Sequence, residues 1–139
     1  MLACREQLEL KADPGELATA RRFVEAAAAR FGLEEQERYE FTFAVNEAVT
    51  NAIEHGRPSP DGKIRLHVAA EDGVLVFEVE DHGTFAPGPP GMDQLHERGR
   101  GLAFMAATMD EVDVRRGSNG TVVRLCKRRS VLPRTSFIS

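Results

Sequence analysis

The side chains most suggestive of chemistry are Glu47 and Asn51, four residues apart in the stretch FTFAVNEAVTNAIEHG (residues 41–56). The stretch has a helical period, so the two side chains are expected on one face, one turn apart. A carboxylate and an amide oxygen placed in this way can hold a hard cation or orient a water molecule. Taken alone, the pattern favours a solvated helix face, although asparagine is a poor helix former and is seldom found inside a helix without a reason.

The predicted helix around these two residues divides into a core face and a polar face. Its apolar stripe comprises Val45, Ala48, Val49, Ala52 and Ile53. Nearly opposite this stripe lie Glu47, Asn51 and Glu54, flanked by His55. Phe43 and Ala44 are also expected on the polar side, as if something covers part of it.

A second candidate site ends a predicted strand, where VEDHGTF places Asp81 two residues before Gly83. A carboxylate can accept a hydrogen bond from a donor such as an exocyclic amine. Glycine permits a tight turn and a close approach of the backbone to a ligand. An Asp-x-Gly turn after a strand is also common where no ligand binds.

Glycines and arginines alternate in RGRGLAF (residues 98–104), directly before a predicted helix. Free backbone N–H groups and the helix dipole favour phosphate there, and Arg98 and Arg100 add positive charge. A flexible entry to the helix is the simpler alternative. The spacing fits neither G-x-x-x-x-G-K-[ST] nor G-x-G-x-x-G, so it supports neither a Walker loop nor a Rossmann turn.

The elements that must position these residues follow from periodicity and from capping and turn residues. In chain order they are a strand (5–12), helices (13–32 and 34–55), a hairpin (63–71 and 74–80), a long loop (81–101), a helix (102–109) and a second hairpin (111–116 and 121–126). A capping box of Asp13 and Glu16 should start the first helix, and Gly32 should end it. Asp72 and Gly73 suit a type I′ turn, which needs positive φ at both positions.

The order β-α-α-β-β-loop-α-β-β predicts an α+β protein, a two-layer α/β sandwich with helices on one face of a mostly antiparallel sheet. Gly120 and Thr121 stand at the start of its last strand, where a hairpin turn explains most of the pattern. A single domain over residues 1–127 is expected, followed by a basic, partly disordered tail over 128–139. The charged residues Lys127, Arg128 and Arg129 are expected to be solvated, with an acidic partner as the alternative.

Composition narrows the functional classes. The 139 residues are 42% hydrophobic and 29% charged, with a net charge of −4, so nucleic acid is not the expected partner. Cys4 and Cys126 have no metal-site spacing and are expected to be reduced thiols. Neither a membrane span nor a signal peptide is predicted, which leaves the cytoplasm as the expected location.

These motifs occur in a fixed order: Glu-x-x-x-Asn on a helix, Asp-x-Gly after a hairpin, a long loop, Gly-x-Gly before a helix, and Gly-Thr near the end. Together they resemble the ATP-binding fold, also called Bergerat-type, of gyrase, the ninety-kilodalton heat-shock chaperone, histidine kinases and mismatch-repair ATPases. NEAVTNAIEHG and RGRGLAFMAATMDEVDVRRGSNGTVVRL look most similar to the bacterial anti-sigma factor serine/threonine kinases. The resemblance extends from about Leu8 to Leu125 and implies a kinase that uses ATP and Mg²⁺.

The resemblance also implies roles for individual residues. Glu47 would be the general base for the attacking hydroxyl, and Asn51 would ligate Mg²⁺. Asp81 would accept a hydrogen bond from the adenine amino group, and Gly83 would let the base lie close. Phosphoryl transfer needs charge neutralisation and in-line positioning above all, and these residue types suit that need.

The remaining implied nucleotide contacts are Gly99, Arg100, Gly101 and Leu102 at the phosphates, Thr121 near the adenine, and His55 at the phosphate or ribose edge. The loop before Gly99 would act as the ATP lid. Two departures stand out: Phe85 occupies the place of a second glycine after Asp-x-Gly, and Pro87, Pro89 and Pro90 stiffen the lid.

The resemblance further implies protein partners. These are an anti-sigma factor antagonist as the phosphorylated substrate, a sigma factor that the kinase sequesters, and a second copy in a homodimer. One alternative is a non-catalytic or weakly catalytic nucleotide-binding module that acts by protein binding. Another is a kinase or ATPase that serves a pathway without a sigma factor.

Overall fold

A computed structural model describes residues 2–55, 62–82, 103, 105–117 and 120–130, and the statements below concern that part of the chain. Its elements in order are β1 (Leu2–Lys11), η1 (Pro14–Glu16), α1 (Leu17–Phe31), α2 (Glu35–His55), β2 (Lys63–Glu71), β3 (Val74–Asp81), β4 (Glu111–Gly117) and β5 (Gly120–Arg128). Residues 103 and 105–108, before β4, are also helical.

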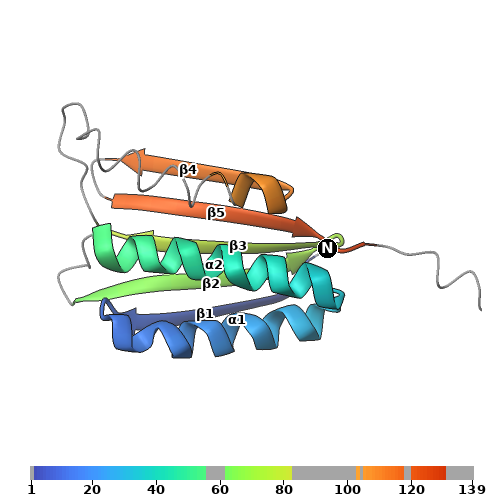
Figure 1. Cartoon of the computed structure of the whole chain (residues 1–139), viewed down its shortest axis with the longest axis horizontal. Helices are drawn as coiled ribbons and strands as arrows, with labels where there is room; N and C mark the ends of the chain where they lie inside the picture. Colours follow the sequence, from blue (N-terminus) through green and yellow to red (C-terminus); the bar gives the residue numbers. More distant parts are fainter. Residues whose placement is uncertain (1, 56–61, 83–102, 104, 118–119, 131–139) are drawn as a thin grey trace, which may run out of the picture.

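The five strands form one antiparallel sheet in the order β1-β2-β3-β5-β4. Figure 1 shows α1 and α2 side by side on one face of this sheet, where α1 packs against β2 and α2 packs against β3 and β5. The predicted α+β class, with an antiparallel sheet and helices on one face, is therefore confirmed. Within the described chain, no helix is both long and apolar enough to cross a membrane.

The β2–β3 hairpin forms through the predicted turn, since Asp72 has φ 50° and Gly73 has φ 78°. Alternate residues of both strands are buried, as expected for a sheet with one covered face. Leu66, Phe77 and Leu125 from three neighbouring strands are fully buried. The helix-covered face of the sheet therefore forms one side of the hydrophobic core.

The start of the first helix differs from the predicted capping box. The Asp13 carboxylate accepts from the Gly15 amide at 3.0 Å, which starts the 3-10 turn η1 before α1. The Asp13 amide donates to the Lys11 carbonyl instead of to a glutamate. At the other end Gly32, with φ 90°, terminates α1 as predicted.

Helix α2 buries a wider arc than its predicted stripe. Val45, Ala48, Val49 and Ala52 are buried as predicted, and Ile53 packs partly against them. Ala44, which was expected on the polar side, is completely buried, so that expectation was wrong. Ala44 lies one turn before Ala48, and α2 packs against both the sheet and α1, which extends the buried arc to Ala44.

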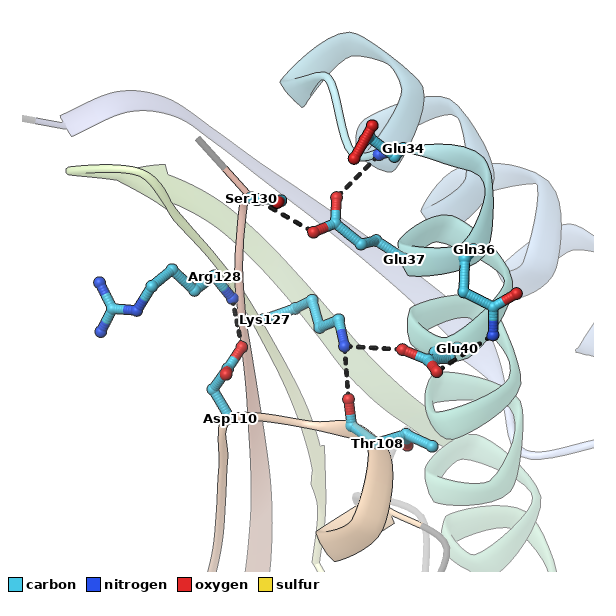
Figure 2. A network of polar contacts seen from close by, with 9 residues as sticks. All are labelled: Glu34, Gln36, Glu37, Glu40, Thr108, Asp110, Lys127, Arg128 and Ser130. Atoms are coloured by element: carbon cyan, nitrogen blue, oxygen red, sulfur yellow. Dashed lines mark hydrogen bonds and ion pairs between the residues drawn. The ribbon is translucent and has the colours of Figure 1, made fainter. Parts of the chain in front are cut away.

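The predicted solvation of Lys127 was also wrong. Its side chain is 11% exposed, and its ammonium donates to the Glu40 carboxylate at 2.8 Å and to the Thr108 carbonyl at 2.5 Å (Figure 2). The Arg129 guanidinium also contacts another element. It donates to the Phe31 carbonyl and lies 4.9 Å from the centre of the Phe31 ring. Arg129, which follows the end of β5, thus packs against the end of α1.

Candidate functional site

The fold brings three predicted site segments to one end of the molecule. The carboxyl-terminal half of α2, the end of β3 and the start of β5 all lie at the left of Figure 1. The β3–β5 register pairs Asp81 directly with Thr121. Two predicted adenine contacts that are 40 positions apart in the sequence are therefore neighbours.

Asp81 and Thr121 are polar residues in a buried position, 8% and 7% exposed. The Thr121 hydroxyl oxygen is buried and has no hydrogen-bond partner among the described residues. A buried hydroxyl without a partner costs free energy, because it has lost its contact with water. The site therefore offers a hydroxyl suited to a polar ligand group or a bound water.

Gly120 lies against the backbone at the end of β3. Its φ is 144°, and a Cβ atom there would overlap the carbonyl oxygen of Asp81. Only glycine permits this approach of the two backbones. The sequence indicated Gly120 merely as part of a hairpin turn, since its proximity to Asp81 depends on strands that are far apart in the chain.

Glu47 and Asn51 lie on α2, away from the completely buried residues of its core face, and both are half-buried. Their separation of four residues keeps them on one side of the helix. Glu54 is exposed, one turn beyond. The predicted polar face of α2 is thus present, at the end of the helix that lies beside the end of β3 (Figure 1).

The remaining predicted site residues lie outside the described part of the chain. These are Gly83, Gly99, Arg100, Gly101 and Leu102. His55 ends α2, but its side chain is likewise outside the described part. The same holds for the lid residues Phe85, Pro87, Pro89 and Pro90.

The described oxygen donors of the candidate site suit a magnesium ion that binds together with a phosphate-bearing ligand. Among the described residues, no group of three or more His, Cys, Asp or Glu side chains could enclose a metal. Mg²⁺ usually takes only one or two protein oxygens and completes its octahedron with water and phosphate oxygens. Asn51 can supply one such oxygen from α2.

A groove of about 750 Å³ lies elsewhere, between the outer faces of α1 and α2. Tyr39 and Phe43 line it and are 61% and 41% exposed, with their ring centres 6.1 Å apart. Among the described residues, none of the predicted nucleotide contacts lines this groove. It is therefore separate from the candidate site.

Cys126 is a free thiol on β5 that donates to the Glu111 carboxylate at 3.3 Å. Burial, followed by the hydrogen bond to Glu111, raises the pKa of this thiol to about 11. The thiol is thus protonated at neutral pH and is a poor nucleophile. Cys126 does not contribute to the candidate site.

Residues 10–127 match the histidine kinase-like ATPase domain family. The chain is similar to the serine-protein kinase RsbW of Bacillus pumilus, with 30% identity over 131 residues, 84% of this chain and 81% of that protein. It is also similar to the anti-sigma F factor of Geobacillus stearothermophilus, with 37% identity over 118 residues, 78% of this chain and 81% of that protein.

The fold is similar to a crystal structure of the RsbU and RsbW domains of a Mycobacterium tuberculosis protein, with a TM-score of 0.73 and 25% identity. The similarity covers 94% of this chain and 34% of that one. The chain thus spans about a third of the length of that solved chain.

Proposed function

Because this chain belongs to the histidine kinase-like ATPase domain family, we propose that it is a serine/threonine protein kinase that binds Mg-ATP and phosphorylates an anti-sigma factor antagonist. The family match confirms the resemblance predicted from the order of the motifs. The observation that carries the proposal is the pairing of buried Asp81 with Thr121 at the end of the sheet where the polar face of α2 also lies.

In this proposal the end of the sheet binds the adenine. Asp81 accepts a hydrogen bond from the adenine amino group, and the Thr121 hydroxyl provides a second polar contact. Gly83 lets the base lie close to the backbone. The burial of Asp81 and Thr121 supports these roles, because hydrogen bonds in a site shielded from water discriminate strongly between ligands.

The phosphates would lie between α2 and the residues that follow the long loop. Asn51 contributes an oxygen to Mg²⁺, which supplies charge neutralisation for the phosphates. Gly99, Arg100 and Gly101 donate to the phosphate oxygens, with Leu102 directly after them. His55, the last residue of α2, lies at the phosphate or ribose edge.

Glu47 acts as the general base. Its carboxylate takes the proton of a serine or threonine hydroxyl on the antagonist while that oxygen forms a bond to the γ-phosphorus. The bond between the γ-phosphorus and the bridging oxygen breaks, and ADP leaves. Glu47 lies one turn from Asn51, so the base and the metal ligand come from a single rigid helix.

Sequestration of a sigma factor and formation of a homodimer complete the proposal. A similar protein is named as an anti-sigma F factor, which supports sigma factor binding. Figure 1 shows α1 and α2 on one face of the sheet, and the opposite face carries half-buried ion-pairing residues such as Arg124 and Glu78. We propose that a second copy binds this opposite face. We place the protein in the cytoplasm.

The test is transfer of labelled γ-phosphate from ATP to the cognate antagonist by the wild type, Glu47→Gln and Glu54→Gln. Glu54→Gln is a matched control, because it makes the same change two turns further along α2 at an exposed position. We expect Glu47→Gln to lower the rate by roughly 100-fold or more, with ATP affinity retained, and Glu54→Gln to transfer normally.

Equal transfer by Glu47→Gln and the wild type would refute the assignment of the base. Binding of Mg-ATP by the wild type without any transfer would instead favour the non-catalytic binding module. Transfer to a protein unrelated to sigma factor control would place the kinase in another pathway.

A further inference from the structure

Two exposed aromatic rings lie beside each other on α2, in the groove between α1 and α2. Among the described residues, Tyr39 and Phe43 are the only large hydrophobic side chains that are exposed. Their ring centres are 6.1 Å apart, and the ring planes are tilted by 50°. A single exposed apolar side chain is ordinary, but two neighbouring aromatic rings in a groove are typical of a protein-binding surface.

The walls of this groove carry charges of both signs. The charged residues that line it are Arg21 and Glu25 on α1 and Glu35 and Arg38 on α2. Nucleic acid and anionic membrane surfaces attract an excess of positive charge, which these four residues do not provide. The groove therefore suits a protein partner, whose docking surface has an apolar centre surrounded by side chains of both signs.

The two rings are aligned with the proposed general base on the same helix. Phe43 lies four residues before Glu47, and Tyr39 lies four residues before Phe43. Residues four apart are neighbours along one side of a helix. The rings therefore lie about 6 and 12 Å before Glu47 along the helix axis. Asn46, the neighbour of Glu47 in the chain, also lines the groove, so the groove leads toward the proposed base.

The nucleotide and the core leave these rings unexplained. The proposed adenine contacts Asp81 and Thr121 pair at the end of the sheet, and neither lines the groove. The sequence predicted that something covers the polar side of α2 near Phe43 and Ala44. The core covers Ala44 completely, whereas Phe43 remains 41% exposed in the described part of the chain.

We propose that this groove is the docking surface for the protein substrate of the kinase. Apolar side chains of the substrate contact Tyr39 and Phe43 while its serine or threonine hydroxyl reaches Glu47. This inference rests on the proposed function, because it takes Glu47 as the general base. The substrate should accordingly present apolar side chains about 6 and 12 Å from its acceptor hydroxyl, which the docked complex holds at the base.

The experiment compares Tyr39→Ala/Phe43→Ala with the wild type and with Arg22→Ala/Gln36→Ala. This control removes two exposed side chains from the same two helices, at positions that do not line the groove. Steady-state transfer of labelled γ-phosphate to the purified antagonist gives KM and kcat. Direct titration gives the Kd for the antagonist and, separately, the Kd for Mg-ATP.

We expect the aromatic variant to raise the KM and the Kd for the antagonist by roughly 10- to 100-fold, because aromatic anchors dominate protein interfaces. Docking contacts are the same before and during transfer, so kcat at saturating antagonist should stay within about twofold. The Kd for Mg-ATP should not change, and the control should match the wild type throughout. A merely structural role of the rings would lower the amount of folded kinase and leave the KM of the folded fraction unchanged.

Should the double variant fail to fold, Tyr39→Glu serves instead, because Tyr39 is 61% exposed and a charge there opposes apolar docking. Its KM for the antagonist should rise in the same direction. Normal transfer by the wild type with an unchanged KM in the folded aromatic variant would overturn this inference alone. Loss of a wild-type dimer in that variant, again with an unchanged KM, would assign the groove to a second copy and also overturn it. No transfer by the wild type would overturn the proposed function and, with it, this inference.

Discussion

At the scale of single residues, the candidate site is defined by polar groups in positions where the fold would otherwise place apolar ones. Asp81 continues the inward-facing series of β3 that contains Phe77 and Val79. Thr121 is buried opposite Asp81, with a hydroxyl that has no partner among the described residues. A valine would fill the Thr121 position without that oxygen, and the proposed function assigns the hydroxyl to the nucleotide.

Thr121→Val tests this interpretation. Loss of an unpaired buried hydroxyl should leave the free energy of unfolding within about 1 kcal/mol of the wild type, or raise it. Loss of a contact to the nucleotide should raise the Kd for Mg-ATP by about 3- to 10-fold. Denaturant unfolding and direct titration measure the two quantities.

Thr42→Val is the control for this prediction, because Thr42 lines the groove between α1 and α2, away from the site. It should leave the Kd unchanged. A Thr121→Val protein that loses several kcal/mol of stability while binding Mg-ATP normally would mean that the hydroxyl serves the fold and not the ligand.

At the scale of elements, local sequence patterns specify where helices and turns begin and end. Gly32 shows this directly, because it terminates α1 with φ 90° and donates from its amide to the Ala28 and Ala29 carbonyls. An alanine has space there, with the nearest side-chain atom 3.5 Å from its Cβ, but must adopt a left-handed conformation. The left-handed backbone conformation alone should thus determine how much the free energy of unfolding falls.

Gly32→Ala should lower the free energy of unfolding by about 1 kcal/mol, measured by denaturant unfolding. Gly15→Ala is the matched control, since its Cβ would lie 3.6 Å from the Asp13 carboxylate and Gly15 is not left-handed. It should change the unfolding free energy by no more than about 0.5 kcal/mol. Equal losses in both variants would contradict the assignment of α1 termination to Gly32.

The sequence predicted where helices and turns begin and end better than it predicted which of their side chains are buried. Burial depends on neighbours that are distant in the chain. The β2–β3 turn and the extent of α2 follow from local residue types, and both agree with the structure. The burial of Ala44 depends on how α2 packs on its neighbours. The burial of Lys127 requires Glu40, 87 positions earlier, so no local pattern indicates it.

At the scale of the whole molecule, the sheet order explains how scattered motifs become one site. β5 inserts between β3 and β4, and this places Thr121 beside Asp81. The sequence predicted both residues through the resemblance, and the family match confirms that resemblance. The sequence did not predict the close approach of Gly120 to Asp81, because that contact arises only from the strand register.

The most direct test of a nucleotide site at this end of the sheet is thermal unfolding with and without Mg-ATP. A ligand that binds only the folded state at about 100 times its Kd adds roughly 2.7 kcal/mol of stability. For a chain of this size we predict that Tm rises by roughly 10 °C for the wild type. Asp81→Asn, which removes the proposed adenine acceptor, should show a much smaller rise at the same concentration. An unchanged Tm of the wild type in millimolar Mg-ATP would contradict the nucleotide site.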